Sequence, residues 1–312
     1  MARAPAKVIL VGEHWVVHGG RAVAAAIGLY AVAQCKAKPG DKVIVRSREL
    51  GVEEELDRCR DLCNLAAAWR HIAARHGFRG AVCELSSDIP PGAGLGSSAA
   101  VAAAFAAAYL CVASGGVLDR ELVNRAAFEA EKITHGNPSG IDNTVSVYGG
   151  IVVYRRGREP RRVRASTAGS LLVVNTGIER STRVAVEKFS ARLASLPGSL
   201  AAEMIRLNDI AAGYAVRALR EGDYGALGRV MNLSHGLLQS MGVSLAELDT
   251  IVELLRDMGV YGAKLSGAGL GGVVIAVAEE NAAERIAEEL RRRGYDAFRA
   301  VLPAPGVRVQ TL

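Results

Sequence analysis

A glycine-rich loop that runs directly into an alanine-rich helix is the feature that most restricts what this chain can fold into. Residues 87–100 read SDIPPGAGLGSSAA, and small apolar residues continue to about 112. Glycine lets a backbone approach a ligand closely, and the first N–H groups of a helix are unpaired and partly positive. The sequence therefore predicts an anion-binding loop at the start of a helix over about 97–112. A tight turn with a serine N-cap is the simpler alternative, but it needs fewer glycines and prolines.

Two familiar phosphate motifs fit this loop poorly. A P-loop requires a lysine after its last glycine, and none follows Gly96. The stretches GLGSSA (94–99) and GAGLGG (267–272) match dinucleotide-binding patterns, which leaves a dinucleotide-dependent oxidoreductase as an alternative. However, two prolines separate the first from its strand, and a strand-like run, VVIAV, follows the second.

Hydrophobic periodicity predicts alternating strands and helices over the rest of the chain. Helices are expected over 61–75, 97–112, 119–132 (with Asp119 as N-cap), much of 181–258 and 281–293. Strands are expected over 7–12, 22–35, 42–46, 81–85, 144–154, 171–177, 261–265, 272–278 and 297–302. The length of 312 residues suits two domains, with a boundary near 165–170.

Composition argues against several classes of protein. The net charge of +6 permits an anionic ligand, but aromatic residues are only 5% and form no stripe with the basic ones, so no nucleic acid partner is expected. No apolar run is long enough for a membrane span, and 99–113 comes nearest. The N-terminus enters a strand without a signal-like segment, so we expect a cytoplasmic protein.

The five cysteines form no C-x-x-C pair and have no zinc-like spacing to histidine. They are expected to be free thiols rather than metal ligands. A second unusual stretch, RRGREPRRVR (155–164), is interpreted as a solvated hairpin turn. The alternative is a patch that gathers anions.

The stretch EKITHGNPSGIDN places Glu131 and Asp142 on either side of a rigid loop. Two carboxylates in this arrangement can hold Mg²⁺ or accept a proton from a hydroxyl nucleophile. Either residue by itself would more simply be a solvated acid.

Taken together, three stretches resemble the GHMP small-molecule kinases. They are KVILVGEHWVVHGG (7–20), PPGAGLGSSAA (90–100) and KLSGAGLGG (264–272), where Leu270 replaces a more usual glycine. Within that superfamily, GEHWVVHG and HGNPSGIDNTVSVYGG (135–150) are similar to the mevalonate kinases. The resemblance implies an α+β fold of two domains, an S5 domain 2-like part over 1–167 and a ferredoxin-like part over 168–312. It also implies transfer of phosphate from ATP to the 5-hydroxyl of mevalonate.

The same resemblance implies a role for each matching residue. Asp142 would be the base and Lys7 its cationic neighbour. Ser98 and Glu131 would hold Mg²⁺, and His135 would shape their loop. Residues expected to seat mevalonate are Glu13, His14, Arg180 and Thr182. Residues expected to bind ATP are Pro91, Gly92, Ala93, Gly94, Leu95, Gly96, Ser97, Ser98, Ser266 and Gly267, with Ala268 closing over the site.

The resemblance leaves some points open. Another GHMP kinase acting on homoserine, a sugar or the mevalonate 3-hydroxyl is the nearest alternative. A homodimer is possible, as is common in such kinases. Trp15 is expected to serve in packing.

Overall fold

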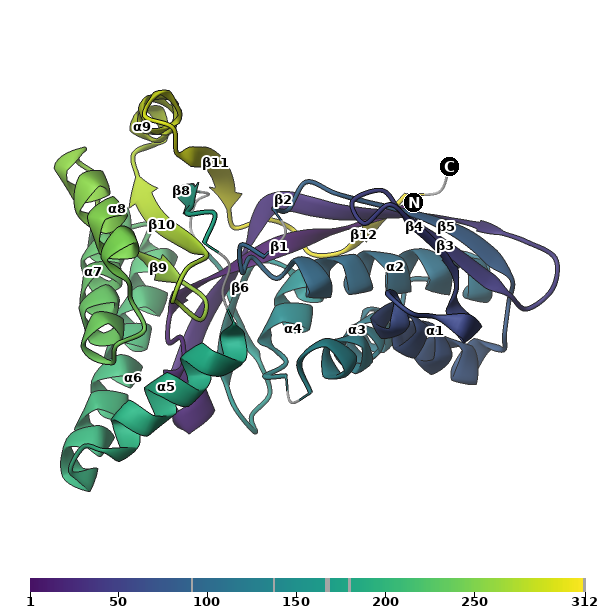
Figure 1. Cartoon of the computed structure of the whole chain (residues 1–312), viewed down its shortest axis with the longest axis horizontal. Helices are drawn as coiled ribbons and strands as arrows, with labels where there is room; N and C mark the ends of the chain where they lie inside the picture. The colour runs from purple at the N-terminus through teal and green to yellow at the C-terminus, as the bar shows by residue number, and fades with distance from the viewer. Residues whose placement is uncertain (91, 137, 166–168, 179–180, 311–312) are drawn as a thin grey trace.

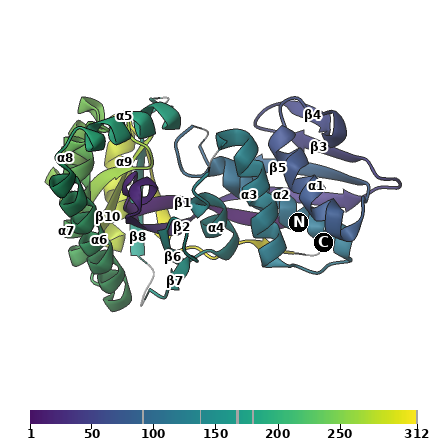
Figure 2. The ribbon, with the colours of Figure 1, turned by 90° about the horizontal axis from the view of Figure 1, so that it is seen from below.

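The computed structural model describes residues 1–90, 92–136, 138–165, 169–178 and 181–310. These residues form two parts that lie end to end, each built on its own sheet (Figure 1). Strand β1 (Ala2–Val11) runs from the first part towards the second, and the antiparallel strand β2 (Arg21–Ala37) returns beside it (Figures 1 and 2). The turn between β1 and β2 therefore reaches the second part, although both strands belong to the first sheet.

The first sheet has the order β12-β1-β2-β5-β3-β4, and β6 and β7 continue it beside β2. Its other strands are β3 (Val43–Ser47), β4 (Val52–Glu55), β5 (Ala81–Ser87), β6 (Ile151–Arg155), β7 (Arg161–Val163) and β12 (Arg308–Val309). All described pairings are antiparallel except that of β3 with β5. The β1–β2 pairing places Lys7 opposite Ala26.

Helices α1 to α4 cover one face of this sheet (Figure 1). They are α1 (Cys63–His76), α2 (Ser97–Ser114), α3 (Arg120–His135) and α4 (Ile141–Tyr148), and short 3-10 helices lie at Trp15–His18 and Leu56–Arg58. Helix α2 is central, and its many alanines let it pack closely against β1, β2 and α3. Among the described helices it alone is long and apolar enough to cross a membrane, yet 61% of it is buried inside the protein, as expected for a core helix.

The second part consists of β8 (Gly169–Asn175), β9 (Gly262–Ser266), β10 (Val273–Ala278) and β11 (Asp296–Leu302) in the antiparallel order β11-β8-β10-β9. Its helices are α5 (Thr182–Ala194), α6 (Gly198–Glu221), α7 (Tyr224–Ser240), α8 (Ala246–Asp257) and α9 (Glu280–Arg292). Leaving aside the additional helices, this order and the sequence strand, helix, strand, strand, helix, strand are those of a ferredoxin-like fold.

Both faces of the second sheet are buried, which explains its continuous apolar runs. Leu171 and Val173 of β8 belong to the core shared with the first part. Leu172 and Val174 point to the opposite face, into a core with α8 and α9. A strand buried on both faces shows no polar alternation, so LLVV and VVIAV are apolar throughout.

The end of the chain returns to the first sheet. Val309 pairs with Ala2 of β1, and Pro305 bridges Gly149. The two described ends therefore lie close together at one end of the molecule (Figure 1). The division at 167/168 stays a prediction, with β8 opening the second sheet just after it.

The structure corrects two expectations and confirms a third. Residues 144–148 belong to α4 rather than to a strand, because Gly140 starts a helix whose first turn carries Asp142.

The cysteine prediction was wrong for four residues. Disulfides join Cys35 to Cys83 and Cys59 to Cys63, and Cys111 alone is free. Cys35 and Cys83 face one another across β2 and β5, which their separation of 48 residues hides. The Arg-rich turn does form the expected hairpin, between β6 and β7.

Candidate active site

The glycine-rich loop joins β5 to α2 and is held at alternate residues. Ala93 and Leu95 are buried, whereas Gly92, Gly94 and Gly96 adopt positive φ angles of 70°, 78° and 73°. The backbone N–H of Lys7 also donates to the Leu95 carbonyl, at 2.9 Å. The buried side chains fix the loop, so its glycine backbone and the start of α2 are left for an anion.

Lys7 and Asp142 form an ion pair beneath this loop. Lys7 Nζ lies 3.2 Å from Asp142 Oδ1 and 3.4 Å from the Gly94 carbonyl. Lys7 is 4% exposed, whereas the Asp142 side chain is 28% exposed. A Cβ on Gly96 would lie 3.0 Å from Lys7 Cγ. A side chain at position 96 would therefore crowd the lysine.

Glu131 is buried on α3, 3% exposed, and its pKa is raised to about 7. Burial is the main cause and the charge of Asp142 adds to it, while a hydrogen bond from Ser98 and the charge of Lys7 act in the opposite direction. Glu131 Oε1 has no hydrogen-bond partner among the described residues. A carboxylate held this way is poised to bind a cation.

The residues around Glu131 fit Mg²⁺. Mg²⁺ takes one or two protein oxygens and completes its shell with phosphate and water. The Glu131 carboxylate and the Ser98 hydroxyl provide two such oxygens. No cluster of three or more His, Cys, Asp or Glu side chains occurs in the part of the chain that the structure describes. His135 Nε2 lies 3.9 Å from Glu131 Oε2, consistent with a role in shaping the loop.

Glu13 is held by a lysine to which sequence analysis gave no role. Lys264 on β9 is fully buried and donates to Glu13 Oε1 and to the Ile9 carbonyl. Burial lowers the pKa of Lys264, and the charge of Glu13 partly offsets this. The partners are 251 positions apart. In the sequence, the only sign of this role is that Lys264 is the single charged residue of an otherwise uncharged strand.

His14 and the second glycine-rich loop also meet at the end of β1. His14 Nε2 lies 2.8 Å from the Ala268 carbonyl, and its ring stacks on Phe189 of α5 with centroids 4.7 Å apart. The Ser266 hydroxyl donates to the Ile9 carbonyl at 3.2 Å and accepts from the Ile9 N–H at 3.0 Å. The two sequence motifs are therefore fastened together through side chains.

Leu270, which replaces a more usual glycine, lies in the second glycine-rich loop. Leu270 has a φ of 55°, a left-handed conformation that favours glycine. Its N–H donates to the Val243 carbonyl at 2.9 Å. Gly267, with a φ of 88°, lies in the same loop.

The predicted site residues thus fall into two neighbouring groups and a remainder. Lys7, Ser98, Glu131 and Asp142 meet beside the first glycine loop. Glu13, His14, Ser266 and Ala268 meet where β1 reaches β9. Thr182 is exposed at the start of α5, and Trp15 is fully buried against Phe189, as expected for packing. Pro91 and Arg180 lie outside the described residues.

Comparison with known proteins agrees with this arrangement. Residues 64–150 match the GHMP kinases N terminal domain, and residues 215–296 match GHMP kinases C terminal. The mevalonate kinase of Aeropyrum pernix is 39% identical over 99% of this chain and 98% of its own, and that of Homo sapiens is 28% identical over 100% and 95%.

Solved structures show the same relationship. The crystal structure of L. major mevalonate kinase in complex with R-mevalonate is 30% identical, with a TM-score of 0.84 over 97% of this chain and 96% of that one. The Methanococcus jannaschii mevalonate kinase is 25% identical, with a TM-score of 0.83 over 97% and 98%. The predicted α+β fold of two parts is confirmed.

Proposed function

The chain belongs to the GHMP kinases and, within them, to the mevalonate kinase family, and from this premise we propose that it transfers the γ-phosphoryl group of ATP to the 5-hydroxyl of (R)-mevalonate. The products are 5-phosphomevalonate and ADP, an early step of isoprenoid synthesis. The observation that carries the proposal is the Lys7–Asp142 pair, set beside the first glycine-rich loop, whose Gly94 carbonyl accepts from Lys7.

ATP would bind with its phosphates against the loop of residues 91–98. Backbone N–H groups at the start of α2 offer fixed donors, and the positive φ angles of the loop glycines keep the main chain uncovered. Ser266 and Gly267 would steady this site from the other glycine loop. Phosphoryl transfer needs positioning and charge neutralisation more than covalent help, and a rigid loop of this kind supplies the positioning.

Asp142 would accept the proton of the mevalonate 5-hydroxyl as that oxygen attacks the γ-phosphorus. The Lys7 ammonium, 3.2 Å from the carboxylate, would stabilise the negative charge that develops on the attacking oxygen. Lys7 is buried and donates to the Gly94 carbonyl. Its position is therefore fixed relative to both the loop and the base.

Ser98 and Glu131 would hold Mg²⁺, which, when bound, neutralises phosphate charge. The negative charge of Asp142 also raises the pKa of Glu131. A cation held by Ser98 and Glu131 would offset this repulsion.

Mevalonate would lie towards Glu13, His14, Thr182 and Arg180. Glu13 Oε2 has no hydrogen-bond partner in the described part of the chain and remains as an acceptor. Its other oxygen is held by Lys264, so its direction is fixed. Stacking on Phe189 fixes the direction of the His14 ring.

A coupled assay of ADP release over a panel of alcohols tests the proposal. (R)-mevalonate should turn over far faster than homoserine or galactose, and ³¹P NMR of the product should show phosphate on the primary 5-oxygen. Faster turnover of homoserine or galactose, or a 3-phosphate, would identify the nearest alternative instead. The dinucleotide alternative is not supported, because the second glycine motif leads into β10 rather than a helix and the first lies within the match to the GHMP kinases N terminal domain.

We also propose two domains, 1–167 and 168–312, a cytoplasmic location and a homodimer.

The dimer is supported by large apolar side chains exposed along one face of α6, namely Leu200, Leu207, Ile210 and Tyr214. Their spacing of seven, three and four residues keeps them in one stripe. Light scattering after gel filtration should give twice the mass of one chain, and a monomer at all concentrations would contradict this.

A further inference from the structure

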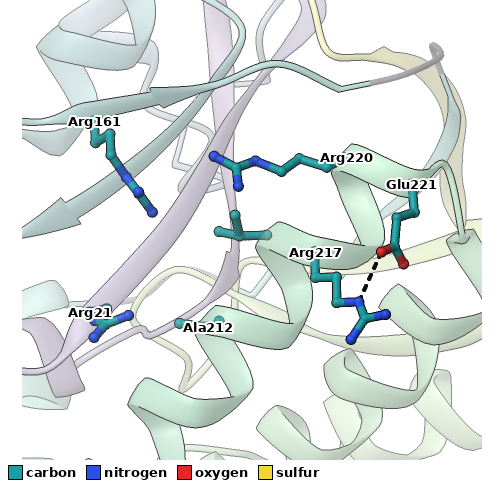
Figure 3. A pocket seen from close by; sticks show the side chains of 8 residues that line it. Arg21, Arg161, Ala212, Arg217, Arg220 and Glu221 are labelled. Atoms are coloured by element: carbon teal, nitrogen blue, oxygen red, sulfur yellow. Dashed lines mark hydrogen bonds and ion pairs between the residues drawn. The ribbon is translucent and has the colours of Figure 1, made fainter.

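A hollow lined mainly by arginine lies away from the two groups of site residues. It lies between α6 and the strands β2 and β7, has a volume of about 400 Å³ and contains none of the residues assigned above to ATP, mevalonate or Mg²⁺ (Figure 3). Its lining is Arg21, Arg161, Ala212, Gly213, Val216, Arg217, Arg220 and Glu221.

The positive charge of this hollow is only partly compensated. Arg217 pairs with Glu221 at 2.9 Å, and Arg21 shares the carboxylate of Asp209 with Arg155. Arg161 and Arg220 have no ion pair among the described residues, and both side chains extend into the space between the strands and α6 (Figure 3). Cations gathered in one hollow without a counter-charge favour the binding of an anion.

The floor and the rim of the hollow differ in character. Ala212 and Val216 form an apolar floor, and neither Ala212 nor Gly213 carries a side chain large enough to fill the space. The rim consists of guanidinium groups, which bind phosphate through paired hydrogen bonds. This volume is in the range of small-molecule sites, whereas a nucleic acid strand would need an extended basic groove.

We propose that this hollow is a second anion site, which binds a small phosphorylated molecule through Arg161 and Arg220. Arg21, which shares one carboxylate with Arg155, adds to the positive field, whereas Glu221 offsets the charge of Arg217. Arg161 comes from the Arg-rich hairpin, so the anion-gathering alternative for residues 155–164 has a specific location. The site is independent of the proposed kinase reaction, since its arginines touch neither glycine loop.

Inorganic pyrophosphate is a suitable probe, in magnesium-free buffer by isothermal titration calorimetry. Since we also propose that the first glycine loop binds phosphate groups, the wild-type protein should show two sites. The variant Arg161→Ala/Arg220→Ala should lose one of them or bind it roughly tenfold or more weakly, with kcat and KM for ATP and mevalonate unchanged. The control Arg285→Ala/Arg292→Ala, which removes the same charge from the exposed face of α9, should keep both sites.

Two results would overturn the proposal. One is pyrophosphate binding that is unchanged in the Arg161/Arg220 variant, or reduced equally in the α9 control, since the effect would then be one of net charge. The other is that the same variant loses more affinity for a single-stranded 20-mer oligonucleotide than for pyrophosphate. The arginines would then belong to a nucleic-acid surface. Both variants change exposed side chains, and equal melting temperatures would show that they fold.

Discussion

Lys7 Nζ lies 3.2 Å from Asp142 Oδ1, which joins strand β1 to the first turn of α4. The pair fixes the carboxylate of Asp142, whose side chain is 28% exposed, whereas Glu131 nearby is buried. The glycine loop lies over both residues, since the Gly94 carbonyl accepts from Lys7 and Gly96 lies close to both side chains.

Asp142→Asn should nearly abolish phosphoryl transfer while ATP still binds. An amide cannot accept the hydroxyl proton, and loss of a general base lowers kcat by about 10² to 10⁴-fold. Steady-state kinetics together with a nucleotide titration would measure both effects. Asp257→Asn, an exposed change at the end of α8, is the control. Full activity of the Asp142 variant would remove the proposed base.

Glu131→Gln should make the magnesium-free protein more stable above pH 7. The pKa of Glu131 rises from 4.5 to about 7 on folding, so the folded state holds this proton more tightly than the unfolded state. Stability is therefore lost as pH rises from about 4.5 to about 7, by about 3 kcal/mol at most. Gln does not titrate, so urea unfolding should show a gain at pH 8 and almost none at pH 4.

The same carboxylate should set the magnesium requirement. A proton and a cation compete for Glu131, so the Mg²⁺ concentration for half-maximal rate should rise when pH falls from 8 to 6. Ser98→Ala and Glu131→Gln should both raise this concentration at pH 8, and the Glu131 variant should lose most of the pH dependence. An unchanged requirement in both variants would contradict the metal assignment.

Gly96→Ala should lower kcat by roughly tenfold or more, because the new methyl group would push Lys7 from its place. Gly115→Ala is a matched control at the other end of α2. The two φ angles are 73° and 72°, and a Cβ on Gly115 meets nothing within 4 Å. Both variants should lose about 1 kcal/mol of stability from backbone strain, so only the kinetic difference reports on Lys7. Equal kcat values would show that the lysine position is unimportant.

Denatured, non-reduced protein should show a single reactive thiol among five cysteines. The free one is Cys111, since the others are paired across β2–β5 and at the start of α1. Titration with a thiol reagent in guanidinium chloride measures this number directly, and reduction beforehand is the control. A count of five without reduction would restore the original sequence-based expectation.

The sequence predicted most of the loop group because its signals are local. The loop glycines, Ser98, Glu131 and Asp142 lie in short runs whose composition is unusual for any other purpose. The helix at 144–148 was missed because TVSVY has a strand-like composition, and only the left-handed Gly140 before it starts α4. Local propensity is a weak guide where tertiary packing decides.

Contacts between distant segments could not be predicted in the same way. Lys264 and Glu13 meet only because β9 lies beside the end of β1, and no periodicity relates positions so far apart. The cross-strand pair of Cys35 and Cys83 depends on the register of β2 with β5. Similarly, the arginine hollow combines residues of β2, β7 and α6, and only the hairpin that contains β7 has an unusual local sequence.

The buried pair of Glu13 and Lys264 should be strongly coupled in stability. Glu13→Gln leaves a fully buried ammonium without a counter-charge and should cost about 3–5 kcal/mol in urea unfolding. Lys264→Met should cost a similar amount, and the double variant should lose much less than the sum. The exposed pair Arg183–Glu187 on α5, changed to Met and Gln, should lose less than about 1 kcal/mol. Additive losses would show that the pair is not coupled. The KM for mevalonate separates the roles of Glu13: Glu13→Gln/Lys264→Met should raise it if Glu13 contacts substrate, and should leave it unchanged if the pair serves only to join β1 to β9.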